Sequence, residues 1–226
     1  MLIALAVAGV LAAAWVLAAL VLTLTRRLSF HQAFFLAPMK LFYRLTGTSA
    51  PARAADPPVI YAVLHQSRLD PALMLSMLPD DTLHMLDEAS ARSAWLEPWR
   101  EMARTIAFNP RHVFVSRRLV RHLRGRGRLA VYFPDGITQD TQAFRIYRAV
   151  AKIAATAEAR IVAVSVLGSR TSVLAFRPRT RRRLLPHLTV SMLEPLSMPE
   201  LVARSRRESP TMAGALFDRV AEADAA

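Results

Sequence analysis

The first 25 residues of the chain carry no charged side chain, and this constrains the fold more than any other feature of the sequence. From Leu2 to Thr25 the run is apolar apart from two threonines. At about 1.5 Å per residue, a helix of this length crosses a bilayer core of about 30 Å. We therefore predict a membrane-anchoring helix over residues 1–25.

A cleaved signal peptide is the alternative for this segment. Such peptides normally begin with positive charge, have a shorter apolar run and end at small residues. Here the positive charges follow the run, at Arg26, Arg27, Lys40 and Arg44. The positive-inside rule then predicts a single-pass anchor in the inner (cytoplasmic) membrane with the remaining chain on the cytoplasmic side. The absence of cysteine agrees, because no disulfide can form.

We expect three parts: the anchor over 1–25, an interfacial helix with a connector over 26–57, and one α/β domain over 58–226. Residues 30–45 combine large apolar side chains with basic ones, a pattern typical of a helix at the membrane interface. The same pattern also suits a helix that covers the core. Residues 46–58 are rich in Pro, Ala, Thr and Ser, which indicates a connector.

From residue 58 onward, segments typical of strands alternate with segments typical of helices. We predict strands at 58–64, 82–86, 105–108, 128–133, 160–167 and 187–193. We predict helices at 71–78, 88–103 with a kink at Pro98, 114–124, 143–157, 199–206 and 210–223. This alternation indicates an α/β fold with a mixed or largely parallel sheet covered by helices, and ligands are expected near strand ends.

A histidine and an aspartate follow the first predicted strand, at His65 and Asp70. An imidazole acts as a general base near neutral pH when a carboxylate holds its other ring nitrogen. Because Pro71 comes next, Asp70 also fits a helix N-cap with proline at the first helical position. His65 alone also fits a structural histidine at a strand end.

The net charge of +13 comes almost wholly from arginine, with 28 arginines and two lysines. Residues 111–128 hold seven arginines and 170–183 hold six, with no acidic residue in either stretch. Guanidinium groups bind phosphate with two parallel hydrogen bonds, so anionic lipids or phosphorylated substrates are expected partners; a solvated surface is the alternative. Nucleic acid is disfavoured, because Phe114 and Phe176 are the only aromatic residues in these stretches.

A second group of polar residues follows the predicted strand at 128–133, in the sequence Phe133-Pro134-Asp135-Gly136-Ile137-Thr138. Proline, aspartate and glycine are turn formers, so a simple reversal of the chain accounts for them. The same residues also place a carboxylate, a hydroxyl and backbone amides at a second strand end.

Together these residues resemble the glycerophospholipid (lysophospholipid) acyltransferase family. Its first motif, His-x-x-x-x-Asp, matches residues 65–70, and its third, Phe-Pro-Glu-Gly, matches residues 133–136 with aspartate in place of glutamate. A fourth apolar strand ends at Gly168. The branch most similar to this chain is the acyltransferase domain of bifunctional 2-acylglycerophosphoethanolamine acyltransferase/acyl carrier protein synthetase, to which 108–110, 146–147 and 182–189 also correspond.

The resemblance implies a role for each matching residue. His65 corresponds to the general base and Asp70 to the carboxylate that orients it. Asp135 and Gly136 correspond to the motif that helps to bind the phosphate region of the acceptor, where the carboxylate would hold an arginine or glycerol hydroxyls. The same loops supply three further candidate substrate contacts, Ser67, Arg68 and Thr138. Arg111, or in its place Arg117 or Arg118, lies in the segment of the second motif.

The function implied is a membrane-anchored O-acyltransferase that uses an acyl-CoA or acyl-ACP co-substrate and a lysophospholipid acceptor. Membrane lipids and an acidic acyl carrier protein are the expected partners, and we expect neither a cofactor nor a metal. Six scattered histidines and no cysteine argue against a structural zinc site. The altered third motif leaves an alternative open, namely an acyltransferase-like membrane protein that has lost catalysis and binds lipids or partners.

Overall fold

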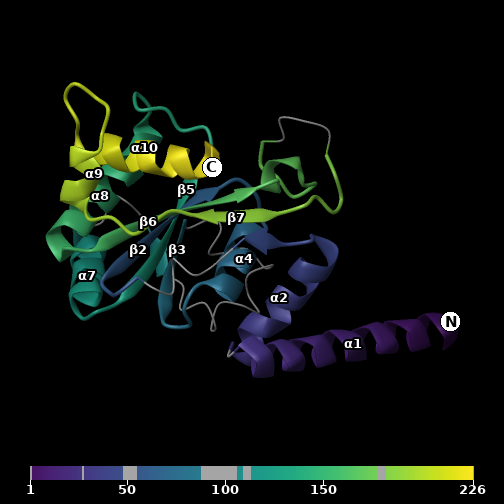
Figure 1. The fold of residues 1–226 in the computed structure, drawn as a ribbon. Coiled ribbons are helices and arrows are strands. Elements are labelled where there is room, and N and C mark those ends of the chain that lie inside the picture. The colour runs from purple at the N-terminus through teal and green to yellow at the C-terminus, as the bar shows by residue number, and fades with distance from the viewer. Residues whose placement is uncertain are drawn as a thin grey trace.

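A sheet lies at the centre of the fold, and helices cover both of its faces (Figure 1). The computed structural model describes residues 2–26, 28–47, 55–87, 106–108, 113–177 and 182–225. Within these ranges the sheet has seven strands in the order β1-β7-β6-β2-β5-β3-β4. The strands are β1 (Thr46–Gly47), β2 (Val59–His65), β3 (Thr82–Asp87), β4 (Ile106–Phe108), β5 (Arg128–Pro134), β6 (Arg160–Leu167) and β7 (Thr189–Met192).

Most strand pairs in this sheet are parallel. β2 lies between β5 and β6 and is parallel to both, and β3 and β4 continue in the same direction. β7 is antiparallel to β6, and β1 is parallel to β7, so the sheet is mixed. The predicted α/β class is confirmed. The sequence did not indicate β1, because two residues are too few for a strand pattern to be visible.

The two faces of β2 belong to two different parts of the core. Every residue of β2 is buried, as expected for a central parallel strand covered on both sides. The even-numbered residues from 60 to 64 belong to one apolar cluster, and the odd-numbered residues from 59 to 63 belong to the other. Successive side chains of a strand point to opposite faces, which explains this division.

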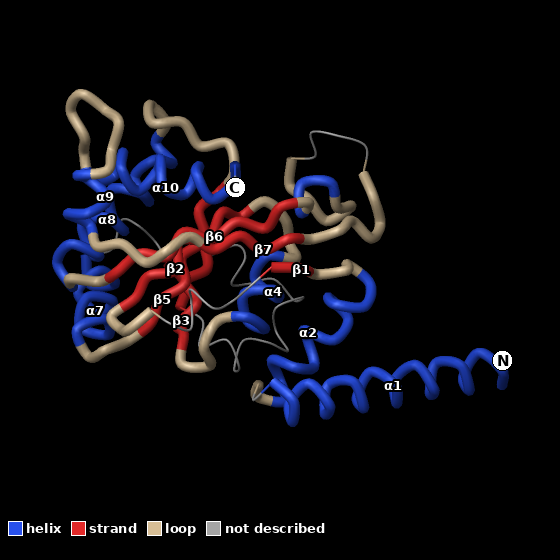
Figure 2. Tube along the Cα trace, in the orientation of Figure 1, coloured by secondary structure: helices blue, strands red, loops and turns tan. Residues whose placement is uncertain are grey.

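Among the residues that the structure describes, four helices cover one face of the sheet, at the left and top of Figure 2. They are α7 (Val113–Arg124), α8 (Arg145–Ala157), α9 (Met198–Ala203) and α10 (Met212–Ala225). Two short 3-10 helices are η1 (Gln142–Phe144), which precedes α8, and η2 (Ser169–Thr171), which follows β6. The C-terminal helix α10 packs directly against β6 and α8.

The opposite face is covered by α2 (Phe30–Phe42) and α4 (Asp70–Met77). Buried residues of α2, among them Ala33 and Leu36, join the apolar cluster, so this helix does cover the core. Phe30, Leu41 and Phe42 remain exposed on the same helix. Its first turn is closed by a capping box between Ser29 and Gln32, a strong signal for a helix start.

The N-terminal helix α1 (Leu2–Arg26) extends away from the remainder of the fold (Figure 1). Its segment Leu5–Thr25 is long and apolar enough to cross a membrane, and almost all of that segment is exposed. Trp15 joins α1 to α2, because its ring stacks on Phe34 at 5.0 Å and its Nε1 donates to the Phe34 carbonyl at 2.7 Å.

The other predicted elements lie close to their observed positions. The predicted strand at 160–167 coincides with β6, and the predicted helix at 210–223 is α10, shifted by two residues. The expected helix at 88–103 and its kink at Pro98 lie outside the described residues.

Candidate active site

His65 and Asp135 lie at the same edge of the sheet because their strands are neighbours in register. His65 is the last residue of β2 and pairs with Pro134, the last residue of β5. The amide of Asp135 donates to the carbonyl of His65 at 3.2 Å. The two sequence motifs therefore meet at the carboxyl ends of parallel strands, where α/β folds place their ligands.

Asp70 is fully buried and accepts several hydrogen bonds from the loop that follows β2. Its Oδ2 accepts from the amides of Gln66 and Ser67, each at 2.7 Å, and its Oδ1 accepts from the Ser67 hydroxyl at 2.9 Å. The N-cap interpretation of Asp70 is wrong, because Leu69 is the cap residue and has no side-chain cap bond. The loop turns back before the helix, so the carboxylate meets amides that precede α4.

The Asp70 carboxylate also holds the catalytic candidate His65. His65 Nδ1 lies 3.2 Å from Asp70 Oδ2, which favours the tautomer with the proton on Nδ1 and the lone pair on Nε2. Tyr132 and Phe176 pack edge-on against the imidazole, with ring centroids 5.5 Å and 4.8 Å away. Only 8% of His65 is exposed. The ring is thus held in one orientation with one nitrogen able to accept a proton.

Ser67 and Arg68 occupy different environments although they are adjacent. Ser67 is fully buried, and its hydroxyl donates to Asp70 and accepts from the Leu69 amide. In this structure Ser67 therefore supports Asp70 and is not positioned to contact a substrate. Arg68 is exposed, and its amide donates to the Leu174 carbonyl at 3.1 Å.

Asp135 binds Arg170, which no sequence motif distinguishes from the other arginines of its stretch. Arg170 donates from Nε and Nη2 to the two carboxylate oxygens of Asp135, at 3.1 Å and 3.0 Å. This is the two-pronged geometry typical of guanidinium and carboxylate. Arg170 belongs to an arginine stretch that directly follows β6, and the end of that strand lies beside the end of β2. The position of Arg170 just after a predicted strand is the sequence feature that points to a place in this site.

The segment after β6 also covers the loop that holds Asp70. Ser67 and Ala175 form an antiparallel bridge, and the Phe176 amide donates to the Gln66 carbonyl at 3.0 Å. Phe176 is 48% exposed while its ring contacts His65. An apolar surface therefore lies directly beside the imidazole.

Gly136 lies against the exposed Arg177. Its φ of +74° is one that residues with a side chain rarely adopt, and an added Cβ would lie 2.5 Å from Arg177 Nη1. The guanidinium thus approaches the Gly136 backbone more closely than any other residue type would allow. Glycine in this motif makes room for a cation next to Asp135.

The remaining candidates lie elsewhere. The exposed Thr138 hydroxyl donates to Asp140 at 2.5 Å within its own turn. Arg117 and Arg118 are exposed on α7, which packs on α8 and β5, and Arg111 lies outside the described residues. Among the described residues, no group of three or more His, Asp or Glu side chains is arranged to hold a metal ion.

A comparison with protein families bears on this arrangement. A family model described as Acyltransferase matches residues 34–167, more than half of the chain. The chain belongs to the acyltransferase family. The matched range includes His65, Asp70 and Asp135, whereas Arg170 and Arg177 lie beyond it.

A solved structure shares the fold of this acyltransferase. It is the crystal structure of the 1-acyl-sn-glycerophosphate (LPA) acyltransferase PlsC from Thermotoga maritima, with a TM-score of 0.54 and 13% sequence identity. The match covers 87% of this chain and 81% of that chain. Membership of an acyltransferase family, predicted from the motifs, is confirmed; the bifunctional branch stays a prediction.

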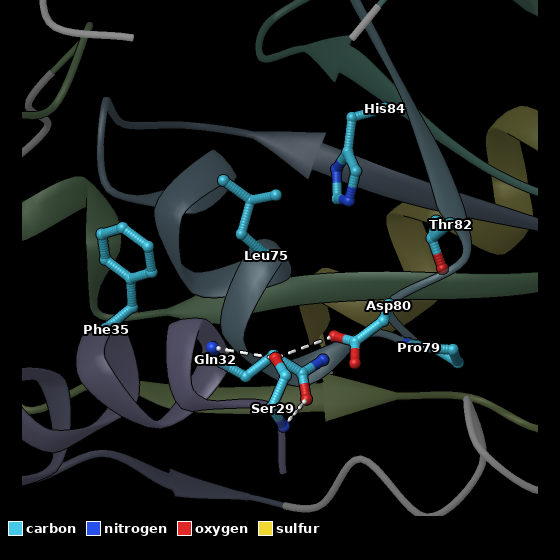
Figure 3. Close-up of a pocket in the computed structure, with 8 residues that line it drawn as sticks. All are labelled: Ser29, Gln32, Phe35, Leu75, Pro79, Asp80, Thr82 and His84. Carbon is cyan, nitrogen blue, oxygen red and sulfur yellow. Dashed lines mark hydrogen bonds between the residues drawn. The ribbon is translucent and has the colours of Figure 1, made fainter. Parts of the chain in front are cut away.

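A second buried histidine lies near this candidate site. His84 Nδ1 is 2.9 Å from the Tyr132 hydroxyl, and the Tyr132 ring in turn packs against His65. Burial lowers the pKa of His84 to about 4, and burial together with the nearby Asp70 raises the pKa of Tyr132. His84 and Thr82 line a cavity of about 40 Å³ on the side of α2 (Figure 3).

Replacing His84 by asparagine is expected to flatten the acid dependence of stability. The pKa of His84 is about 4 when folded, against 6.5 for an ordinary histidine, so between these values only the unfolded wild-type chain gains a proton. Wild-type stability falls as pH falls through this window, by up to about 3 kcal/mol, and shows no such loss above it. Denaturant titrations of both proteins across this range measure the difference. Parallel stability curves would show that His84 is not buried in its neutral form.

Proposed function

We propose that this acyltransferase moves a fatty acyl group from a thioester of coenzyme A or acyl carrier protein to the free hydroxyl of a lysophospholipid or related glycerophosphate lipid. The observation that carries the proposal is the His65 and Asp70 pair. A buried carboxylate holds Nδ1 of an imidazole at a sheet edge, which leaves Nε2 to act as the base.

The proposed reaction needs no covalent acyl-enzyme. His65 Nε2 takes the proton of the acceptor hydroxyl as its oxygen forms a bond with the thioester carbonyl carbon. The tetrahedral intermediate then expels the sulfur, and the imidazolium returns the proton to that thiolate. Asp70 stabilises the transient positive charge on the ring. The products are an oxygen ester and a free thiol, so atoms and charges balance.

Exposed arginines at this edge support a phosphate-bearing acceptor. Arg177 lies against Gly136, and Arg68 lies within the loop that holds Asp70. Arg170 has two carboxylate partners, Asp135 and Asp224, so much of its charge is already compensated. We assign phosphate contact to Arg68 and Arg177 and assign to Arg170 the support of the Asp135 loop.

The N-terminal helix supports a location at the membrane. The exposed apolar segment Leu5–Thr25 would anchor the chain, with exposed Phe30, Leu41 and Phe42 of α2 at the interface. The arginines that follow the segment favour the cytoplasmic side of the inner membrane. An acceptor lipid would then reach His65 without leaving the bilayer surface.

A basic surface on α7 and α8 supports an anionic acyl donor. Its exposed arginines are Arg117, Arg118, Arg121, Arg124, Arg145 and Arg148. Both coenzyme A, through its phosphates, and an acidic acyl carrier protein complement this charge. Salt would weaken the docking of either donor to this surface.

Replacing Gly136 by alanine is expected to raise the KM for a phosphate-bearing acceptor by about tenfold, because the new Cβ displaces Arg177 from its place. The backbone strain of alanine at this positive φ costs only about 1–2 kcal/mol, so the protein stays folded. Steady-state kinetics with acceptor varied at fixed thioester measure this effect. An unchanged KM would remove Arg177 from the acceptor site.

Gly168→Ala is the matched control for that variant. Gly168 has a φ of +86°, and an added Cβ would lie 2.1 Å from the backbone carbonyl of His187. A backbone atom cannot move aside as a flexible guanidinium can, so Gly168→Ala should lower stability by more than Gly136→Ala, by about 3 kcal/mol or more. Thermal melts of the two variants separate loss of fold from loss of acceptor binding.

A direct test uses the purified full-length protein in mixed micelles. Acyl-CoA and acyl carrier protein thioesters are each offered with lysophospholipids of several head groups, and lipid mass spectrometry detects the acylated product. The proposal predicts product with at least one phosphate-bearing acceptor. Binding of lysophospholipid without any product would favour the alternative of a lipid-binding protein that has lost catalysis.

A further inference from the structure

Asp224, on the C-terminal helix α10, makes polar contacts with three other parts of the fold. Its carboxylate accepts hydrogen bonds from Gln66 Nε2 at 2.6 Å and from the Ser165 hydroxyl at 3.1 Å, and it forms an ion pair with Arg170, whose Nη2 lies 2.8 Å from Oδ2. The Asp224 side chain is only 18% exposed. These partners lie on the loop after β2, on β6 and in η2. One carboxylate thus joins elements that are far apart in the sequence.

Gln66 links Asp224 to the Asp70 carboxylate. The backbone amide of Gln66 donates to Asp70 Oδ2 at 2.7 Å, and its side-chain oxygen accepts from the Ser169 hydroxyl at 2.9 Å. Gln66 is buried, so its amide side chain has little freedom once Asp224 and Ser169 hold it. Asp224 therefore restrains the residue that supplies one hydrogen bond to Asp70.

Arg170 links Asp224 to the second motif. The same guanidinium that binds Asp224 makes the two-pronged contact with Asp135, whose amide donates to the His65 carbonyl. The contacts therefore form a closed ring. Gln66, the neighbour of His65 in the chain, binds Asp224, and Asp224 binds Arg170. Arg170 binds Asp135, whose amide donates to the carbonyl of His65. Connected polar contacts among partly buried groups of this kind favour one arrangement of the groups they join.

We infer that Asp224 is a positioning residue of this acyltransferase, which sets the relative placement of the His65 loop and the Asp135 loop through Gln66 and Arg170. The inference rests on the proposed function. It assigns a role in the site to α10, which lies beyond the family match at residues 34–167. Misplacement of reacting groups by about 1 Å costs about a hundredfold in rate, which sets the scale of the effect.

The test is Asp224→Asn, which keeps the size of the side chain. An amide has one acceptor oxygen, so its NH₂ group must face either Arg170 or the donors of Gln66 and Ser165. Packing of α10 is preserved, because the helix docks through apolar residues such as Leu216 and Val220. Glu222→Gln is the matched control, since it removes the same charge from the same helix and its partner Arg219 also lies on α10.

Hydrogen exchange measured by mass spectrometry gives a readout that does not require activity. Asp224→Asn should accelerate amide exchange in peptides covering 64–70 and 134–141, with no change over α8, whereas Glu222→Gln should leave all of these at the wild-type rate. Unchanged exchange in both loops overturns the inference. Equal acceleration throughout the protein overturns it as well, because that is the mark of general destabilisation.

Kinetics then connect the positioning to the reaction. Per folded molecule, Asp224→Asn should lose about ten- to a hundredfold in kcat with little change in the KM for the thioester, and Glu222→Gln should stay near wild type. Gln66→Met removes the hydrogen bond between Gln66 and Asp224 from the Gln66 side. When it is combined with Asp224→Asn, kcat should fall little further than in Asp224→Asn alone. Additive losses would overturn the inference. If Asp224→Asn showed the localised acceleration of loop exchange while the wild-type protein had no transferase activity, the proposed function would be rejected and the positioning role would stand.

Discussion

His65→Ala is expected to lower kcat by about 10²- to 10⁴-fold, because the variant lacks the group that accepts the proton of the acceptor hydroxyl. The KM for the thioester should change little, since His65 acts on the acceptor in the transition state. Fold should be retained, as His65 lies at the end of β2 where its ring contacts Tyr132 and Phe176. Initial rates of thiol release at saturating substrates measure the loss.

His84→Asn is the control for this prediction. It changes another buried histidine, on β3, which β5 separates from the strand of His65, and it keeps a partner for the Tyr132 hydroxyl. Its kcat should stay within about threefold of wild type. If His65→Ala retained wild-type kcat, or if both variants lost the same activity, His65 would not be the base.

Asp70→Ala is expected to destabilise the protein and abolish transfer together. The change removes the acceptor for the amides of Gln66 and Ser67 and for the Ser67 hydroxyl, all within a buried loop. Each buried donor left without a partner costs about 1–3 kcal/mol, so a total loss of about 3–5 kcal/mol is expected. Thermal melts should show a Tm lower by about 10 °C.

Asp70→Asn separates catalysis from stability at the same position. The asparagine oxygen can take over the contacts of Oδ2, while its NH₂ group can donate to the Ser67 oxygen. Stability should fall by only about 1 kcal/mol. A neutral amide does not stabilise an imidazolium, so kcat should still fall by at least about a hundredfold. Nearly full activity in Asp70→Asn would show that the Asp70 charge plays no part in the reaction.

The pattern of apolar residues in this sequence predicts most of the fold. Continuous apolar runs such as 59–64 specify buried strands, and the long uncharged run at the N-terminus specifies a helix. Register was not predictable from either run, yet it is what brings His65 beside Asp135. The sequence does show that each motif follows a predicted strand, and neighbouring parallel strands end at one edge of a sheet.

The sequence does not predict which residues support the site through contacts with segments that are distant in the chain. Arg170 belonged to an arginine stretch in which no single residue stood out, and its pairing with Asp135 depends on how β6 lies in the sheet. In the sequence, Gln66 is a polar residue between His65 and Asp70 that no feature distinguishes from its neighbours. Asp224 is one carboxylate in a helix whose pattern indicates only apolar packing. The placement of Ser67 as a support for Asp70 likewise depends on the turn of the loop.

The most direct test measures thiol release and lipid acylation in the same reaction. Purified wild-type protein, His65→Ala and Asp70→Asn are incubated in mixed micelles with one acyl thioester and one lysophospholipid, and both products are quantified. We predict one molecule of free thiol for each molecule of acylated lipid with wild type, and almost neither product with the two variants. Equal acyl transfer by all three proteins would contradict general-base catalysis by His65 and Asp70.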